Sequence, residues 1–376
     1  MKILIRIVSS VILLVVFSFG KESLYLHIPS KFPSNSVNTT FGYELLSLIN
    51  SAEDEICFAI YGLRGQDDVL QALIDAKNRG VEIKGIVDSD SKDKNYYSDT
   101  HLLYKHFDIV SDHKSYIMHN KFFVIDKKTV WTGSSNISDT GTGGYNANNA
   151  ITIENKKIAS IYLDEFENMF DDEKFGIWKD IRSYQDIETD DSVISVYFSP
   201  KSKTYENGIK ELIEDADEYI YIPIFYLTHK DLSKQLIKAH KRGVEVKIIL
   251  DASAVRNKYS THKALRENGI KVKVENFGGK MHAKSIIIDD KYFVSGSMNL
   301  TKAGNIRNDE NTIIVKNTKL TKQYKKYFLK LWNMIPSKYL YYDPNPESKK
   351  SGNSCLDGID NDFDHTVDSK DKMCLK

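Results

Sequence analysis

The sequence lacks a net charge, because 52 lysine and arginine residues balance 52 aspartate and glutamate residues. A protein without an overall basic field does not draw nucleic acid towards it over long distances. The balance therefore argues against a nucleic-acid substrate without excluding one, since a neutral protein can still contain a basic cleft. At 376 residues, the chain is long enough for two domains with cores of their own.

Long apolar runs are also missing, with one exception at the N-terminus. Residues 8–19 form an apolar stretch after a short positive start, and Ser18 and Gly20 place small residues at the −3 and −1 positions of a cleavage before Lys21. This pattern is typical of a secretory signal peptide over residues 1–20 and predicts a secreted or periplasmic protein. The stretch is short for a membrane-spanning helix, although an uncleaved membrane anchor is the alternative.

Cysteine is scarce, with three residues in the whole chain. Cys57 lies in an apolar run and is predicted to be a buried, unreactive side chain. Cys355 and Cys374 lie near the C-terminus, and a disulfide between them would close a loop of about 20 residues, worth roughly 3 kcal/mol in the chain-entropy model. Such a disulfide agrees with export from the cytosol.

The sequence contains one polar pattern twice. The first copy consists of His119, Lys121, Asp126 and the Gly-Ser-Ser-Asn run at 133–136. The second consists of His282, Lys284, Asp289 and the Gly-Ser-Met-Asn run at 296–299. The differences 282 − 119, 289 − 126 and 296 − 133 are all 163. This fixed register indicates two similar lobes that each carry half of a site.

The duplication extends upstream, where the run at 79–84 (RGVEIK) recurs at 242–247 (RGVEVK). Apolar runs at 56–61, 122–125, 220–225 and 286–288 predict buried strands, and the spacing in 69–76 and 232–239 predicts helices. We therefore expect an α/β protein of two similar lobes, each a mixed sheet flanked by helices, related by internal duplication. We assign residues 21–190 to the first lobe and 191–343 to the second.

With both copies in view, the chain resembles the phospholipase D superfamily, whose signature is His-x-Lys-x4-Asp followed by Gly-Ser-x-Asn. The resemblance covers residues 51–332, and both signatures are intact. It implies a phosphodiesterase that needs no cofactor. It also includes Asp126 and Asp289 in the site, where the family's aspartate is largely structural. The superfamily acts on phospholipids, DNA, RNA and protein–DNA adducts, so the resemblance does not choose the substrate.

The residues themselves suit phosphodiester cleavage, which needs charge neutralisation, a nucleophile and an acid for the leaving oxygen. One histidine would attack phosphorus to give a phosphohistidine, while the other protonates the leaving oxygen and later activates water. Residues two apart on a strand share a face, so each His-x-Lys pair would present both side chains to the phosphate. The predicted phosphate-binding residues are Lys121, Lys284, Ser134, Ser297, Asn136 and Asn299.

The two histidines are not expected to be equivalent. The resemblance assigns the nucleophile to His119 and the general acid to His282. It also places an acceptor for a histidine ring nitrogen at Glu310, whereas the aligned residue of the first lobe is Asn148. A carboxylate stabilises an imidazolium better than an amide does. If Glu310 serves His282 of its own lobe, this asymmetry reverses the order of roles.

The chain ends in a linker and an acidic tail at 344–376, in which the aspartates follow the spacing D-x-D-x-D-x-x-x-D-x-x-D. They are Asp360, Asp362, Asp364, Asp368 and Asp371. Carboxylates on alternate residues suit calcium, and the segment resembles a loop of thrombospondin type 3 or EF-hand type. His365 stands where such loops have glycine, and the last ligand position is aspartate rather than glutamate. A disulfide-closed acidic tail without metal is the alternative.

The sequence thus predicts a secreted, metal-independent phosphodiesterase that works as a monomer with a pseudo-twofold active site. A phospholipid substrate is slightly favoured because the chain is neutral, and a membrane surface would then be a partner. The alternatives are a secreted endonuclease acting on DNA or RNA, a phosphatidyl transferase, and an inactive adhesion or binding protein.

Overall fold

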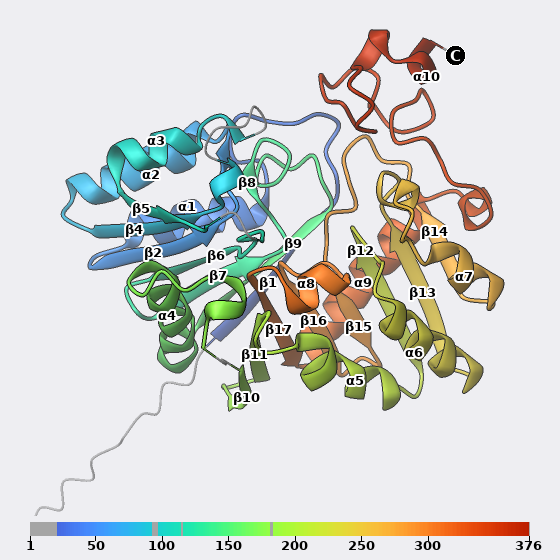
Figure 1. Ribbon diagram of the computed structural model, residues 1–376, viewed down its shortest axis with the longest axis horizontal. Helices are drawn as coiled ribbons and strands as arrows, with labels where there is room; N and C mark the ends of the chain where they lie inside the picture. The colour runs from blue at the N-terminus through green and yellow to red at the C-terminus, as the bar shows by residue number, and fades with distance from the viewer. Residues whose placement is uncertain (1–20, 92–96, 114–115, 181–182, 376) are drawn as a thin grey trace, which may run out of the picture.

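We describe the computed structural model of the chain over residues 21–375, apart from 92–96, 114–115 and 181–182 (Figure 1). The predicted signal peptide, residues 1–20, lies outside the described residues. Within the described ranges, no helix is both long enough and apolar enough to cross a membrane.

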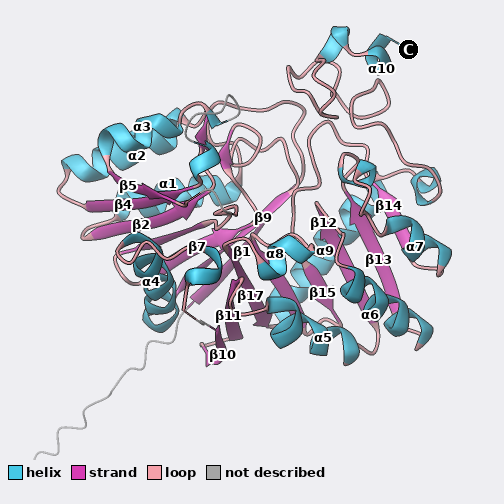
Figure 2. Cartoon of the chain, viewed as in Figure 1, coloured by secondary structure: helices cyan, strands magenta, loops and turns pink. Residues whose placement is uncertain are grey.

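Two sheets with helices packed against them make up most of the chain (Figure 2). The first sheet contains β1 (Lys21–His27), β2 (Glu55–Ile60), β4 (Glu82–Val87), β5 (Asp108–Ser111), β6 (Phe122–Ile125), β7 (Thr129–Gly133) and β9 (Asn148–Glu154). The second contains β10 (Ser183–Glu188), β11 (Val193–Ser199), β12 (Tyr219–Ile224), β13 (Glu245–Leu250), β14 (Lys271–Val274), β15 (Ile286–Ile288), β16 (Tyr292–Gly296) and β17 (Glu310–Lys316). The short strands β3 (Leu63–Arg64) and β8 (Ile137–Ser138) pair with each other.

The helices follow the same duplication. The helices of the first lobe are α1 (Thr40–Ser51), α2 (Asp67–Asn78), α3 (Thr100–His106) and α4 (Lys156–Phe170). Those of the second are α5 (Lys210–Glu214), α6 (Lys230–Lys241), α7 (His262–Glu267), α8 (Lys302–Ile306) and α9 (Thr318–Met334), and α10 (Lys372–Leu375) lies in the tail.

The two sheets correspond strand for strand. Their orders are β1-β9-β7-β6-β2-β4-β5 and β10-β11-β17-β16-β15-β12-β13-β14, so the second differs by the added edge strand β10. In each sheet, the last three strands run parallel and the others pair antiparallel. The predicted α/β fold of two mixed sheets related by duplication is therefore confirmed.

The repeated Arg-Gly pair marks the end of a helix in each lobe. Gly80 and Gly243 have φ of 100° and 105°, in the left-handed region that glycine adopts at little cost, so α2 and α6 stop there. The guanidinium of Arg79 donates to Ile49 O at 3.0 Å, and that of Arg242 donates to Glu214 O at 2.8 Å. Each arginine thus ties the chain to carbonyls at the end of the preceding helix.

Three buried apolar clusters support this arrangement. One lies entirely within the first lobe and one within the second. The third and largest contains residues from both lobes, including Phe166 of α4 and Phe328 of α9, so the lobes share a core. Because apolar burial is the main source of folding free energy, this shared core holds the two lobes together. This interface positions the paired polar motifs.

Candidate active site

Each histidine is held by backbone of the opposite lobe. The amide of His119 donates to Asp309 O at 2.8 Å, and the amide of His282 donates to Ala147 O at 3.0 Å. The prediction that each His-x-Lys pair lies within a strand is wrong, since both pairs lie just before β6 and β15. The reason is that the chain pairs across the lobe interface there, before it enters its own sheet.

The acceptors for the two rings also cross the interface. His119 Nδ1 lies 2.7 Å from Glu310 Oε2, and His282 Nδ1 lies 3.1 Å from Asn148 Oδ1. The possibility that Glu310 serves the histidine of its own lobe is therefore wrong. Glu310 begins β17, which the shared core places against the first-lobe motif. The only carboxylate acceptor of the pair thus belongs to His119.

The serines of the two Gly-Ser-x-Asn runs hold these acceptors. Ser134 Oγ donates to Asn148 Oδ1 at 2.9 Å, and Ser297 Oγ donates to Glu310 Oε2 at 2.6 Å. A hydroxyl has one proton to donate. Because that proton is already used, the structure does not support Ser134 and Ser297 as phosphate ligands. The residue before Ser134 must be glycine for steric reasons, because a Cβ on Gly133 would lie 2.3 Å from Asn149 O.

The two lysines are buried beside the histidines. Lys121 Nζ donates to His119 O at 2.9 Å, and Lys284 Nζ donates to His282 O at 2.6 Å. Burial lowers the pKa of Lys121 to about 7 and lowers that of Lys284 well below its ordinary value. A bound phosphate would reverse this shift, because a nearby negative charge favours the ammonium form. Both lysines would therefore become cationic when an anionic ligand binds.

Burial also lowers the pKa of both histidines. The lysines of both lobes lower the pKa of both histidines further, and at His119 alone the Glu310 carboxylate partly opposes the shift. Both rings are therefore neutral near pH 7 in the empty site. In His119, the tautomer that donates Nδ1–H to Glu310 leaves the Nε2 lone pair available, which is the form that a nucleophile requires.

The two motif asparagines have different surroundings. Asn136 lines a cavity of about 330 Å³ together with His282, and its Oδ1 is buried without a partner among the described residues. Asn299 Oδ1 accepts from Tyr226 N at 3.3 Å. Of the two, Asn136 is the one that lines the cavity at His282.

The signature aspartates lie away from the histidines. Asp126 Oδ1 accepts from Asp54 N at 2.8 Å, and Asp289 Oδ1 accepts from Tyr219 N at 2.7 Å, each with further amides of the same turn. Both residues have φ near 50° at the end of a strand. Their carboxylates therefore fix the turn before β2 and before β12. Neither carboxylate contacts a histidine among the described residues, which agrees with the largely structural role that the resemblance implies.

Sequence reasoning missed a second pair of aspartates. Asp88 accepts from Met118 N at 2.8 Å, and Asp251 accepts from Met281 N at 2.9 Å. These amides belong to the residues just before the two histidines, so the aspartates position the catalytic backbone. Burial and a neighbouring carboxylate raise the pKa of Asp88 to about 7. The 163-residue offset between Asp88 and Asp251 was the available signal.

Two asparagines were also missed. Asn311 Oδ1 accepts from Lys121 N at 2.9 Å, and Asn149 Oδ1 accepts from Ser285 Oγ at 3.3 Å. Both bonds cross between the lobes, and both asparagines are fully buried. Each follows the acceptor residue directly in sequence, so one dipeptide in each lobe orients the histidine and joins the lobes. The sequence does not indicate whether these asparagines bond within their own lobe or across to the other lobe.

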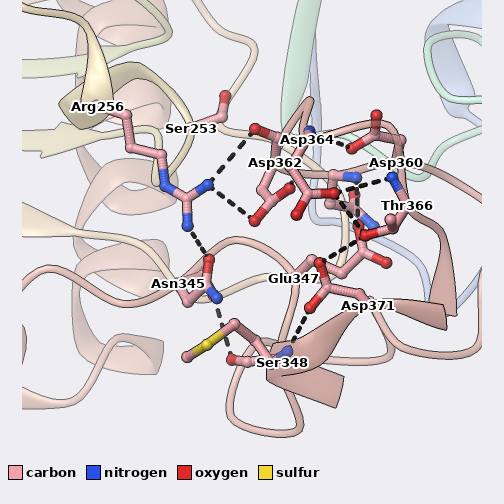
Figure 3. Close-up of polar contacts among 12 residues, drawn as sticks. Ser253, Arg256, Asn345, Glu347, Ser348, Asp360, Asp362, Asp364, Thr366 and Asp371 are labelled. Carbon is pink, nitrogen blue, oxygen red and sulfur yellow. Dashed lines mark hydrogen bonds and ion pairs between the residues drawn. The ribbon is translucent and has the colours of Figure 1, made fainter. Parts of the chain in front are cut away.

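The acidic tail contains two groups of three carboxylates whose oxygens lie within 4.8 Å of one another (Figure 3). One group is Glu347, Asp360 and Asp362, and the other is Asp362, Asp364 and Asp371. Asp368, which was predicted as a ligand, instead accepts from the amides of Asp357 and Gly358. Glu347 was missed because it lies in the linker, outside the aspartate spacing.

The predicted disulfide is confirmed. Cys355 and Cys374 are bonded, with 5.6 Å between their Cα atoms, and Cys57 is a free buried thiol. Burial raises the pKa of Cys57 to about 12, which agrees with an unreactive side chain.

The fold and the paired histidine–lysine site define the chain as a hydrolase of phosphodiester bonds. A family description, "Cardiolipin synthase, PLD-like domain", matches residues 45–170 and 209–332, one match in each lobe. The chain therefore belongs to the phospholipase D superfamily. The comparison carries no support for the resemblance of the tail to a thrombospondin-type loop, because both matches end before the tail.

Individual relatives agree with this assignment. The chain is 32% identical over 160 residues to "Phospholipase D" of Rickettsia prowazekii, covering 42% of this chain and 78% of that one. It is 29% identical over 133 residues to the human "Mitochondrial cardiolipin hydrolase", covering 35% of this chain and 51% of that one. A phosphatidylserine synthase of Haemophilus influenzae has the same fold, with a TM-score of 0.62, 14% identity, and coverage of 84% and 93%.

Proposed function

We propose that the chain hydrolyses a phosphodiester through a phosphohistidine on His119, with His282 as the general acid. One observation carries the assignment of roles, namely the Glu310 carboxylate at 2.7 Å from His119 Nδ1. A histidine that bonds to phosphorus becomes cationic, and a carboxylate on its other nitrogen stabilises that charge. His282 has only the amide of Asn148, which suits a group that alternates between acid and base.

The proposed reaction has two displacements. In the first, His119 Nε2 bonds to phosphorus, the bond to the leaving oxygen breaks, and His282 gives that oxygen a proton. In the second, water bonds to phosphorus as His282 takes its proton, and the phosphorus–nitrogen bond breaks. Lys121 and Lys284 neutralise the non-bridging oxygens throughout, so the proposal requires no metal. The anionic phosphate also raises the pKa of His282 when it binds, which supplies the protonated acid.

We favour a phospholipid as the substrate. The relatives described above carry the names phospholipase D and cardiolipin hydrolase, and the chain has no net positive charge for nucleic acid. Each lobe of a single chain supplies one histidine and one lysine to the site, so we also propose that the enzyme is a monomer. Nucleic-acid cleavage and phosphatidyl transfer to an alcohol are alternative outcomes of the experiment below.

The experiment incubates the purified chain in EDTA with mixed phospholipid vesicles, with plasmid DNA and with RNA, in parallel. We expect release of lipid head groups, and we expect His119→Ala and His282→Ala each to abolish it while the fold is kept. Cleavage of plasmid or RNA with intact vesicles would reassign the substrate. Near-full activity in either histidine variant would refute the shared site.

We further propose export to an oxidising compartment, which the Cys355–Cys374 disulfide supports. The N-terminal residue of the protein recovered from culture medium or periplasm tests this, and Lys21 is the expected result. Calcium binding by the tail is also a proposal, based on the chemistry of the carboxylate groups alone. Calorimetric titration with calcium, compared between the native chain and Asp362→Asn, tests that proposal.

A further inference from the structure

The C-terminal tail, drawn in red in Figure 1, contacts both lobes beside the cavity at His282. On the first-lobe side, Tyr145 Oη donates to the carboxylate of Asp357, and Asn353 Nδ2 donates to Lys31 O at 3.2 Å. Tyr145 is buried, although it lies in a loop between strands. The tail therefore contributes, together with Gly278 of the second lobe, to the burial of this ring.

On the second-lobe side, the tail is anchored by charge. Arg256 Nη1 lies 2.8 Å from Asp362 Oδ2, and its other terminal nitrogen donates to Asn345, as Figure 3 shows. Asn276 Nδ2 donates to Lys350 O at 3.0 Å. These contacts hold the tail, including the segment at 360–365, against the second lobe.

The tail residue that faces the cavity is Phe363. It lines the 330 Å³ cavity together with His282, Phe225 and Lys280. Lys280 Nζ lies 4.1 Å from the centre of the Phe363 ring and 5.9 Å from that of Phe225. The Phe225 ring in turn lies 5.2 Å from the His282 ring. A short series of contacts thus leads from the tail to the proposed general acid.

The conformation of Phe363 is unusual for a bulky residue. Its φ is 62°, in the left-handed region, and its side chain is 54% exposed. The Asp360 carboxylate accepts from the amides of Asp364 at 3.2 Å and His365 at 2.9 Å, and so fixes the turn around it. An aromatic ring that is held in a strained backbone and left half exposed at a cavity is available to a ligand.

We infer that Phe363 is a specificity-determining residue that contacts the apolar part of the leaving alcohol, which is the lipid head group in the proposed reaction. This inference rests on the proposed function, because the cavity belongs to His282, the residue assigned to protonate the leaving oxygen. The tail then forms one wall of the substrate site rather than a separate attachment segment. Tyr61, Tyr97 and Phe225 supply the other apolar surfaces of the cavity.

The test compares two phospholipids that differ only in the leaving alcohol, phosphatidylmethanol and phosphatidylbenzyl alcohol. The measured quantity is the ratio of their kcat/KM values, in which the intrinsic reactivity of each ester cancels between variants. We expect Phe363→Ala to lower the benzyl-to-methyl ratio about tenfold, the factor that corresponds to roughly 1.4 kcal/mol of lost contact. Phe363→Leu, which keeps an apolar side chain, should recover most of the ratio.

Leu356→Ala is the matched control, because Leu356 is 74% exposed in the same tail and does not line the cavity. If Phe363→Ala and Leu356→Ala both leave the ratio at its native value, the inference is overturned.

A binding measurement separates this inference from the proposed reaction. Calorimetry of the full chain with methyl phosphate and with benzyl phosphate reports the contact without turnover. If the native chain hydrolyses neither lipid but Phe363→Ala still loses about tenfold in selectivity for benzyl phosphate, the contact stands and the proposed function fails. If the chain hydrolyses the lipids but Phe363→Ala changes neither the kcat/KM ratio nor the ratio of the two phosphate affinities, the proposed function stands and the inference fails. Absence of both hydrolysis and selective binding refutes both.

Discussion

Glu310→Gln removes the charge that distinguishes the two histidines and keeps the shape of the side chain. The carboxylate lies 2.7 Å from His119 Nδ1 and is buried. Replacing a charged acceptor by a neutral one weakens a hydrogen bond by about 1 kcal/mol. Loss of Coulomb stabilisation of the imidazolium at about 4 Å adds up to roughly 4 kcal/mol at an effective dielectric constant of 20. Together these losses amount to about 1 to 5 kcal/mol, so we expect kcat to fall between about 5-fold and several thousand-fold.

The same variant should shift the pH profile. Glu310 raises the pKa of His119 against the opposing effect of burial, so its removal lowers that pKa further. Because the nucleophile must be neutral, the acid limb of kcat/KM should move to lower pH in Glu310→Gln. Glu154→Gln is the control, since Glu154 is an exposed carboxylate at the far end of β9. A native pH profile and native kcat in Glu310→Gln would refute the assignment of Glu310 to the nucleophile.

Two further predictions concern stability. Lys121→Met should abolish turnover but raise the free energy of unfolding. The pKa of Lys121 is about 7 in the folded state and 10.5 in the unfolded state, so burial of this lysine destabilises the folded protein by up to about 5 kcal/mol at neutral pH. Between these two pKa values, Lys121 is protonated in the unfolded state but not in the folded state. The gain in the free energy of unfolding from Lys121→Met should therefore be largest at pH 7 and below and should vanish towards pH 10.5. A gain that stays constant in urea titrations across this range would contradict the lowered pKa. Asp289→Ala should lower the free energy of unfolding by about 2–5 kcal/mol, because three amides, including that of buried Tyr219, lose their acceptor. The folded fraction should keep its native kcat, and a large loss of kcat would show that Asp289 also acts in catalysis.

The duplicated fold could be predicted because it depends on patterns that repeat within each lobe. The apolar runs that become β2 and β12, and the helical spacing of α2 and α6, are local signals. The paired motifs likewise identified both histidines and both lysines. These residues lie at equivalent positions, so the sequence alone indicated that they act together.

The pairing across the lobes could not be predicted. Glu310 and His119 are separated by 191 positions, and no local pattern states which histidine an acceptor will reach. The hydrogen bonds of Ser134 and Ser297 to Asn148 and Glu310 could not be predicted for a related reason, since a hydroxyl near a phosphate site can bond either the ligand or a neighbouring side chain. Phe363 was missed because its contribution depends on how the tail folds back over the lobes.

Mapping the covalent intermediate tests the central claim most directly. The enzyme is mixed with labelled substrate for less than one turnover and quenched in alkaline denaturant, which preserves a phosphorus–nitrogen bond. Proteolysis and mass spectrometry then locate the adduct. We predict a phosphoryl-type adduct on His119, the histidine that Glu310 supports. An adduct on His282, with none on His119, would contradict the assignment of roles.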